Sequence, residues 1–177
     1  MGNQDGLDLL IEAIDHLVKA LGRRNTRFVL VGGGTMLDPL RSLVREKNLD
    51  SYVRFTGKVA HAEVLRHLSE SDIGVAPDPK TPMNDNSTMI KIFEYMAASL
   101  PIVLFDLKEG RRMAAEAALY AQPNDPAEFA NQLERLLQNR ELRKKLGAIG
   151  RRRIEEKLNW NLEKENLLAA YRAALQA

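Results

Sequence analysis

Cysteine is absent from this chain of 177 residues, so disulfide bonds and thiolate metal sites are excluded. The sequence also lacks an apolar run long enough to span a bilayer. Its first ten residues do not show the basic stretch followed by an apolar stretch that marks a secretory signal. These absences predict a cytoplasmic location.

The chain also lacks a large excess of charge of one sign, because its formal net charge is only +2. So small a charge argues against nucleic acid as a partner. The hydrophobic content of 45% and the charged content of 28% are those of an ordinary globular protein. The length is sufficient for one domain with a sizeable core.

One stretch is nevertheless strongly basic. Residues 140–158 contain eight Lys and Arg residues against three Glu residues, a local excess of +5. We interpret this stretch as a solvated helix face. The functional alternative is peripheral contact with the inner face of an anionic membrane that carries a lipid-linked acceptor.

Short apolar runs alternate with amphipathic segments along most of the chain. The apolar runs predict strands at 27–31, 53–56, 73–76, 101–105 and 118–121. The amphipathic segments predict helices at 7–21, 35–47, 61–70, 88–98, 126–138, 140–158 and 161–176. A polar loop is expected from Pro77 to Asn86.

This alternation predicts an α/β fold with a doubly wound, mainly parallel Rossmann-like sheet and helices on both faces. The sheet would occupy residues 1–125, and residues 126–177 would form a C-terminal helical tail anchored in the core by Trp160. Because the opening helix begins almost at Met1, a further strand is expected directly before it.

The glycine cluster Gly32–Gly34 follows the first predicted strand but fits no dinucleotide fingerprint. The third glycine of Gly-x-Gly-x-x-Gly would have to stand at Leu37 or Asp38. The Gly-Lys-Ser/Thr of a Walker loop is absent as well. The cluster is therefore predicted to be a tight turn that lets a ligand, or only the next helix, approach the backbone.

The loop and helix over residues 84–97 carry the most chemistry. Asn86 or Ser87 is the predicted N-cap, and the free N–H groups of such a helix start suit a diphosphate. Ser87, Lys91 and Glu94 recur at helical spacing, so an ammonium and a carboxylate would share one face. The ammonium could reach a phosphate, and the carboxylate could accept hydrogen bonds from two ribose hydroxyls. The alternative is a solvated polar stripe on an amphipathic helix.

Several stretches in register resemble family 4 (group 1) retaining glycosyltransferases, which have the two-Rossmann-domain GT-B fold. They are residues 28–34, 53–59, 71–77 and 94–98, followed by 142–153 and Asn159-Trp160. Segments 84–91, 105–109 and 117–120 are most similar to a subgroup associated with bacterial surface-polysaccharide assembly. The resemblance covers essentially the whole chain and implies the donor-binding C-terminal domain, without the N-terminal acceptor domain.

The resemblance also implies roles for individual residues. Glu94 would hold the ribose, backbone groups at Lys58 and Val59 would hold the base, and the glycine turn would border the nucleotide. The implied donor-binding residues are Gly32, Gly33, Gly34, Lys58, Val59, Asn86, Ser87, Thr88, Met89, Lys91 and Glu94. The substrate would be a nucleoside-diphosphate sugar, in particular a UDP-sugar, and no metal or cofactor would be required.

The chain departs from the family pattern at two positions. Asn86 stands at the family's first glutamate, so no catalytic residue is assigned, since an amide supplies no negative charge to a developing oxocarbenium. Asp5-Gly6 stands where the family has Lys-Gly, so the usual phosphate-binding lysine is missing. Lys91 is the candidate replacement, with Lys80 and Lys108 behind it.

The sequence thus predicts the donor half of an enzyme that transfers a sugar to a polysaccharide or lipid-linked acceptor with retention. Alone, the chain is expected to bind donor without turnover. Two alternatives remain open at this point: half of a nucleotide-sugar epimerase, and a non-catalytic nucleotide-binding or assembly module.

Overall fold

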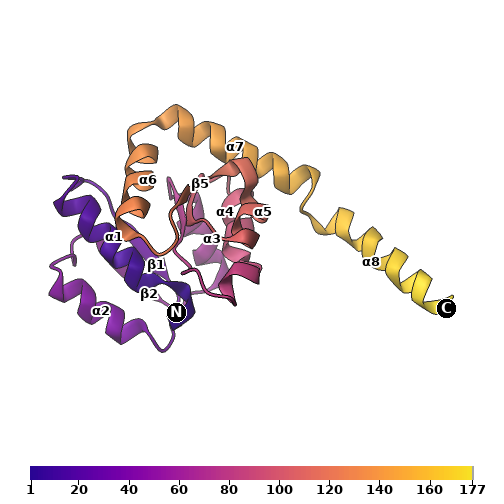
Figure 1. The fold of residues 1–177 in the computed structure, drawn as a ribbon, viewed down its shortest axis with the longest axis horizontal. Coiled ribbons are helices and arrows are strands. Elements are labelled where there is room, and N and C mark those ends of the chain that lie inside the picture. The colour runs from indigo at the N-terminus through magenta and orange to yellow at the C-terminus, as the bar shows by residue number, and fades with distance from the viewer. Residues whose placement is uncertain (177) are drawn as a thin grey trace.

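Five short parallel strands form the centre of the molecule, and helices cover them (Figure 1). The computed structural model describes residues 1–176. The strands are β1 (Phe28–Val31), β2 (Val53–Gly57), β3 (Gly74–Ala76), β4 (Ile102–Phe105) and β5 (Ala118–Ala121). All five predicted strands are confirmed, each within about one residue.

Eight α-helices lie within the described residues. They are α1 (Leu7–Lys19), α2 (Leu37–Glu46), α3 (His61–Ser69), α4 (Ile90–Ala97), α5 (Lys108–Ala114), α6 (Pro126–Gln138), α7 (Arg140–Glu156) and α8 (Trp160–Leu175). Three 3-10 turns join them: η1 (Asn3–Asp5), η2 (Asn84–Asn86) and η3 (Ala115–Ala117). The predicted α/β class, with parallel strands, flanking helices and a helical tail, is confirmed.

The strands form two separate parallel ladders. β1 pairs with β2, and β3 pairs with β4, which pairs with β5, all in parallel. Within residues 1–176 no ladder joins β1 to β3. Strand pairing depends on contacts between distant segments, so the alternation along the chain predicted the strands but not this gap.

The main core lies where α1 and α6 pack against the sheet. The inner face of α1 is fully buried, and the rings of Phe105 on β4 and Phe129 on α6 meet edge to face with centroids 5.0 Å apart. β4 lies between two other strands, and all four of its residues are buried. This core fixes the strands whose carboxyl ends carry the candidate site.

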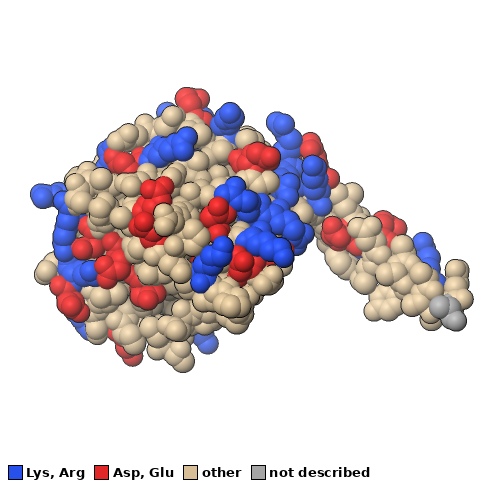
Figure 2. All heavy atoms as spheres, viewed as in Figure 1, with Lys and Arg blue, Asp and Glu red and all other residues tan. Residues whose placement is uncertain are grey.

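The basic stretch forms α7, and three of its arginines have structural partners. Arg143, Arg151 and Arg153 donate to backbone carbonyls at the ends of α6, α4 and α5, over 2.6, 2.6 and 2.7 Å. These bonds satisfy carbonyls that a helix end leaves unpaired. Figure 2 shows the Lys and Arg side chains gathered over α5 and α7. Membrane contact of this face stays a prediction.

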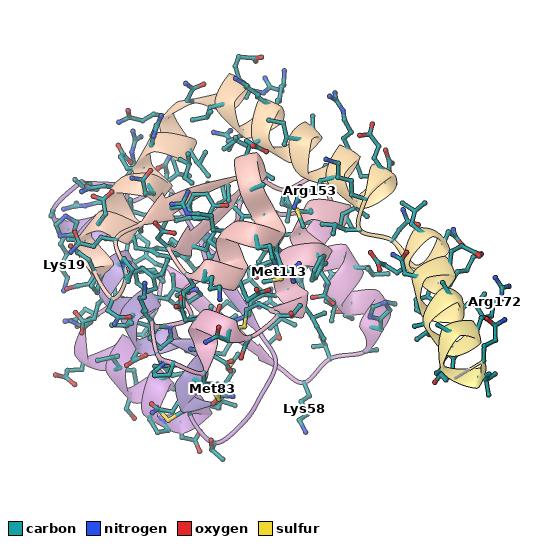
Figure 3. The ribbon with its side chains drawn as sticks, turned by 45° about the vertical axis from the view of Figure 1, so that its right-hand side comes forward. Lys19, Lys58, Met83, Met113, Arg153 and Arg172 are labelled. Atoms are coloured by element: carbon teal, nitrogen blue, oxygen red, sulfur yellow. The ribbon has the colours of Figure 1, made fainter. Side chains whose placement is uncertain are left out.

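Helix α5 was not predicted. It contains Gly110, and its last turn is held by Arg153 from α7, which donates to the carbonyls of Arg112 and Met113 (Figure 3). Because this stabilisation comes from about 40 residues further along the chain, the local sequence gave little indication of a helix.

Helix α8 extends away from the rest of the molecule (Figure 1) and buries none of its side chains. The prediction that Trp160 anchors the tail in the core is wrong, because Trp160 is 65% exposed. The helix keeps an amphipathic sequence, but none of the described elements packs on its apolar face. No helix within residues 1–176 is long and apolar enough to cross a membrane.

Candidate functional site

A cavity of about 1040 Å³ lies between β1 and β3. Its flanks are apolar and include residues 28–31 and 73–75. Polar side chains also line the cavity at both of its ends. The end at the carboxyl ends of the strands, here called the polar end, is lined by Gly32, Lys58, Val59, Lys91 and Glu94, together with Met1 and Asp5. Ligands of open α/β sheets bind beyond the carboxyl ends of the strands, so this polar end is the candidate site.

The glycine turn and the loop after β2 come together at this end. The amide of Gly32 donates to the carbonyl of Gly57 over 3.0 Å, and Gly33 lies against the side chain of Lys58. Gly34 has φ of 147°, and a Cβ there would lie 2.3 Å from the carbonyl oxygen of Met1. The close approach that requires this glycine is therefore made by the chain itself. The side chain of Lys58 is exposed and points away from the ribbon (Figure 3).

Helix α4 begins at Ile90, later than predicted, and Asn86 and Ser87 do not cap it. Their side chains donate instead to the carbonyls of Pro82 and Met83, over 2.9 and 2.6 Å, and close the turn η2. Asn and Ser side chains compete in this way for nearby backbone groups. Ser87 therefore lies outside the helix and does not share a face with Lys91 and Glu94.

The start of α4 is nevertheless open. Its N-cap is Met89, which provides no side-chain hydrogen bond. The amide of Ser87 is bonded to the carbonyl of Asn84, whereas the amides of Thr88 and Met89 have no partner within residues 1–176. The unpaired N–H groups and the positive end of the helix dipole remain available to an anion.

Lys91 and Glu94 lie on the same face of α4 and both line the cavity. Of the eleven implied donor-binding residues, the cavity brings together five, namely Gly32, Lys58, Val59, Lys91 and Glu94. The other six do not line it; they are Gly33, Gly34, Asn86, Ser87, Thr88 and Met89. The carboxylate of Glu94 has no hydrogen-bond partner among the residues described, so it is free to accept hydroxyl protons from a ligand.

The sequence analysis missed the partner of Lys91. Its Nζ lies 2.7 Å from Oδ1 of Asp78, whose side chain is 3% exposed. Burial raises the pKa of the Asp78 carboxyl, and the ammonium of Lys91 opposes that rise. The only indication in the sequence was the position of Asp78, just after β3 at the carboxyl end of the sheet.

Tyr95 was also missed, and it fixes α4 against β3. Its hydroxyl donates to the carbonyl of Val75 over 3.1 Å, and its ring covers Gly74, where a Cβ would come within 2.5 Å of it. Burial raises the pKa of the Tyr95 hydroxyl above its ordinary value. Because Glu94 is the preceding residue, this contact holds its carboxylate at the rim of the cavity.

We expect Lys91→Met to lower the free energy of unfolding by about 2 kcal/mol at neutral pH, because it leaves a buried carboxylate without its cation. With Lys91 gone, the pKa of Asp78 rises further, so the folded state binds more protons than the unfolded state. The deficit, which is the loss of unfolding free energy relative to the unsubstituted chain, should then shrink as the pH falls toward the ordinary carboxyl range and grow as the pH rises. Urea unfolding of both chains at pH 5 and pH 7.5 measures this deficit.

Asp78→Asn/Lys91→Met is the control, since it leaves no buried charge and should show little dependence of the deficit on pH. An equal deficit for Lys91→Met at both pH values would contradict the assigned role of the ion pair.

The chemistry of the site is that of anion and hydroxyl recognition. Within residues 1–176, no group of three or more His, Cys, Asp or Glu side chains is placed to hold a metal ion. The charged side chains at the polar end are the ammoniums of Lys58 and Lys91 and the carboxylates of Asp5 and Glu94. The open amides at the start of α4 do not line the cavity.

Three known proteins illustrate what this chain is similar to, one by sequence and two by structure. The GDP-mannose-dependent alpha-(1-6)-phosphatidylinositol monomannoside mannosyltransferase of Mycobacterium tuberculosis is 24% identical over 160 residues, which are 88% of this chain and 41% of the relative. The structure of an S. aureus TarM mutant in complex with Fondaparinux, alpha-GlcNAc-glycerol and UDP matches with a TM-score of 0.84 and 22% identity. It covers 96% of this chain and 33% of TarM.

The C-terminal domain of a glycosyl transferase group 1 family protein from Francisella tularensis matches with a TM-score of 0.76 and 21% identity. The match covers 90% of this chain and 83% of that domain. By contrast, the chain spans about two fifths of the length of the curated relatives it matches. The structural likenesses establish the fold as that of a GT-B C-terminal domain.

The family described as Glycosyl transferases group 1 matches residues 1–139, most of the chain. The predicted resemblance is confirmed, and this protein belongs to the group 1 glycosyltransferases.

Proposed function

We propose that this chain binds the nucleoside-diphosphate sugar of a retaining glycosyltransferase, with UDP as the preferred nucleotide. The observation that carries the proposal is the face of α4, where Lys91 and Glu94 line one cavity beside an uncapped helix start. The amides at the helix start and the ammonium would bind the diphosphate, and Glu94 would accept hydrogen bonds from the ribose hydroxyls. The UDP in the TarM complex supports the choice of nucleotide.

The same groups suit the chemistry of sugar transfer. As the bond between the anomeric carbon and the phosphate oxygen breaks, positive charge develops on the sugar and negative charge on the diphosphate. Fixed N–H groups and an ammonium stabilise the departing diphosphate without reorganising, and such preorganised donors are a main source of rate enhancement. Asn86 does not line the cavity, so we assign no charge-stabilising role on the sugar to it.

The acceptor would be a polysaccharide or a lipid-linked sugar, bound by an N-terminal domain outside this chain. The chain's coverage of about two fifths of its relatives supports this division. We therefore expect the chain alone to bind donor nucleotide without transferring sugar.

Calorimetric titration with UDP, GDP and ADP tests the nucleotide assignment. We expect UDP to bind most tightly and ADP most weakly. Because one relative is GDP-mannose-dependent, a preference for GDP would replace the proposed nucleotide while keeping the site. No measurable binding of any of the three would overturn the proposal and favour a non-catalytic assembly module.

The role of Lys91 is tested by comparing UDP with uridine. Asp78→Asn/Lys91→Met should weaken UDP binding by about tenfold, because a charge-assisted contact is lost. Binding of uridine, which has no phosphate, should be unchanged. An equal loss of affinity for UDP and uridine would show that the Asp78–Lys91 ion pair supports the structure of the site without contacting the phosphates.

A further inference from the structure

The loop after β3 holds the carboxylate of Asp78 in a buried position. Pro77 and Pro79 flank Asp78, and each proline ring restricts its own φ angle. Gly6 packs so closely against the carbonyl of Pro77 that a Cβ at this glycine would overlap it. The side-chain amide of Asn84, which is buried as well, donates to the carbonyl of Pro79 over 2.9 Å. The backbone on both sides of Asp78 is therefore held in place, and its carboxylate stays behind when a partner moves.

Lys91, the partner of Asp78, is by contrast free to move. Its side chain is 28% exposed and lines the cavity, whereas Asp78 does not line it. Within residues 1–176, Asp78 is the only group that pairs with the ammonium of Lys91. The side chains of a helix lean toward its N-terminus, and lysine has a flexible four-carbon stem. The ammonium can therefore turn from Asp78 to an anion at the open start of α4.

Among the described residues, no second cation faces Asp78. The titratable groups around it are Lys91 and Tyr95 on α4 and Asp5 on η1. The hydroxyl of Tyr95 is already bonded to the carbonyl of Val75, and Asp5 is itself negative. Burial is the main cause that raises the pKa of Asp78, Lys91 opposes that rise, and Asp5 adds a smaller one. When the ammonium leaves, a proton is the remaining counter-charge for this buried carboxylate.

We propose that Asp78 is a positioning residue, which holds Lys91 beside the cavity and takes up a proton from solvent when the donor diphosphate draws the ammonium away. The proton adds to a carboxylate oxygen of Asp78, and no other bond forms or breaks. Once Asp78 is neutral, the diphosphate has the whole charge of Lys91 to itself. The inference rests on the proposed function and adds a pH dependence to it. Because binding consumes a proton, the affinity for the donor falls as the pH rises.

Calorimetric titration in two buffers with different enthalpies of ionisation, PIPES and imidazole, counts the protons taken up. The probe is the methyl ester of UDP on its β-phosphate, because a diphosphate esterified at both ends does not titrate near neutral pH. We expect uptake of on the order of one proton per ligand, and an affinity that falls about tenfold between pH 6 and pH 8. Asp78→Asn should bind the probe without proton uptake and with the same affinity at both pH values.

Asp85→Asn is the matched control, since it makes the same substitution in the neighbouring turn η2. Asp85 accepts a hydrogen bond from the amide of Lys108 over 2.9 Å, and an asparagine oxygen can accept it as well. This variant should take up the same number of protons as the unsubstituted chain. Uridine, which has no diphosphate, should bind without proton uptake.

Binding of the probe without proton uptake would overturn the inference and leave the proposed function intact, because Lys91 would then contact the diphosphate while still paired with Asp78. Undiminished uptake in Asp78→Asn, or uptake with uridine, would overturn it too, since the proton would then be bound elsewhere. No measurable binding of the probe would overturn the inference together with the proposed function.

Discussion

Glu94→Ala should weaken UDP binding by about 100-fold, because two charge-assisted hydrogen bonds to the ribose are lost together. Glu94 lines the polar end of the cavity, and the contact of Tyr95 with Gly74 and Val75 keeps that turn of α4 in place. Its carboxylate is exposed and does not hold the fold together, so the melting temperature should stay the same. Calorimetric titration of the variant with UDP measures the loss.

Two controls separate a ribose contact from a general effect of charge. Glu116→Ala removes an exposed carboxylate that does not line the cavity and should leave UDP binding unchanged. In the unsubstituted chain, 2′-deoxy-UDP should bind more weakly than UDP, whereas Glu94→Ala should bind both equally. A variant that still discriminated between the two nucleotides would exclude Glu94 as the ribose contact.

Gly147→Ala should lower the free energy of unfolding by about 4 kcal/mol, because the added methyl group has no space. A Cβ at this position of α7 would lie 2.1 Å from the carbonyl oxygen of Ser99, just after α4. The obstacle is backbone, so α7 and α4 would have to move apart. Since α4 carries Lys91 and Glu94, the same displacement should weaken UDP binding.

Gly150→Ala is the matched control, one helical turn further along α7. Its Cβ would approach Cγ of Met96 at 3.0 Å, and a flexible side chain can yield where backbone cannot. We expect a loss of about 1 kcal/mol for this variant. Urea denaturation of the two variants side by side measures the difference, and equal losses would show that α7 adjusts freely on α4.

Local sequence sufficed for the strands and for most of the helices. Runs such as Ile102–Phe105 are apolar without interruption, and a run of that kind has few alternatives to a buried strand. The start of α4 was misplaced because Asn86 and Ser87 favour a helix cap and a turn equally well, and here they bond backward to the turn. The break between β1 and β3 depends on long-range pairing, which no local pattern contains.

The site was predictable where its chemistry follows helix periodicity. Lys91 and Glu94 are three residues apart and occupy one face of α4, as their spacing indicates. The roles of Asp78 and Tyr95 were not predicted, because they depend on partners across the fold. Asp78 pairs with an ammonium on α4, and Tyr95 contacts a carbonyl and a glycine on β3. Their sequence neighbourhoods resemble those of ordinary loop and helix residues.

The exposed position of α8 has a consequence for spectroscopy. Trp160 is the sole tryptophan of the chain, and it lies at the start of this helix, largely in solvent. Intrinsic indole emission therefore reports on the tail, and it should stay red-shifted and nearly constant while the strands unfold. A 16-residue helix that buries none of its side chains is only marginally stable in water, so its ellipticity should be lost gradually on heating, separate from the cooperative transition of the body.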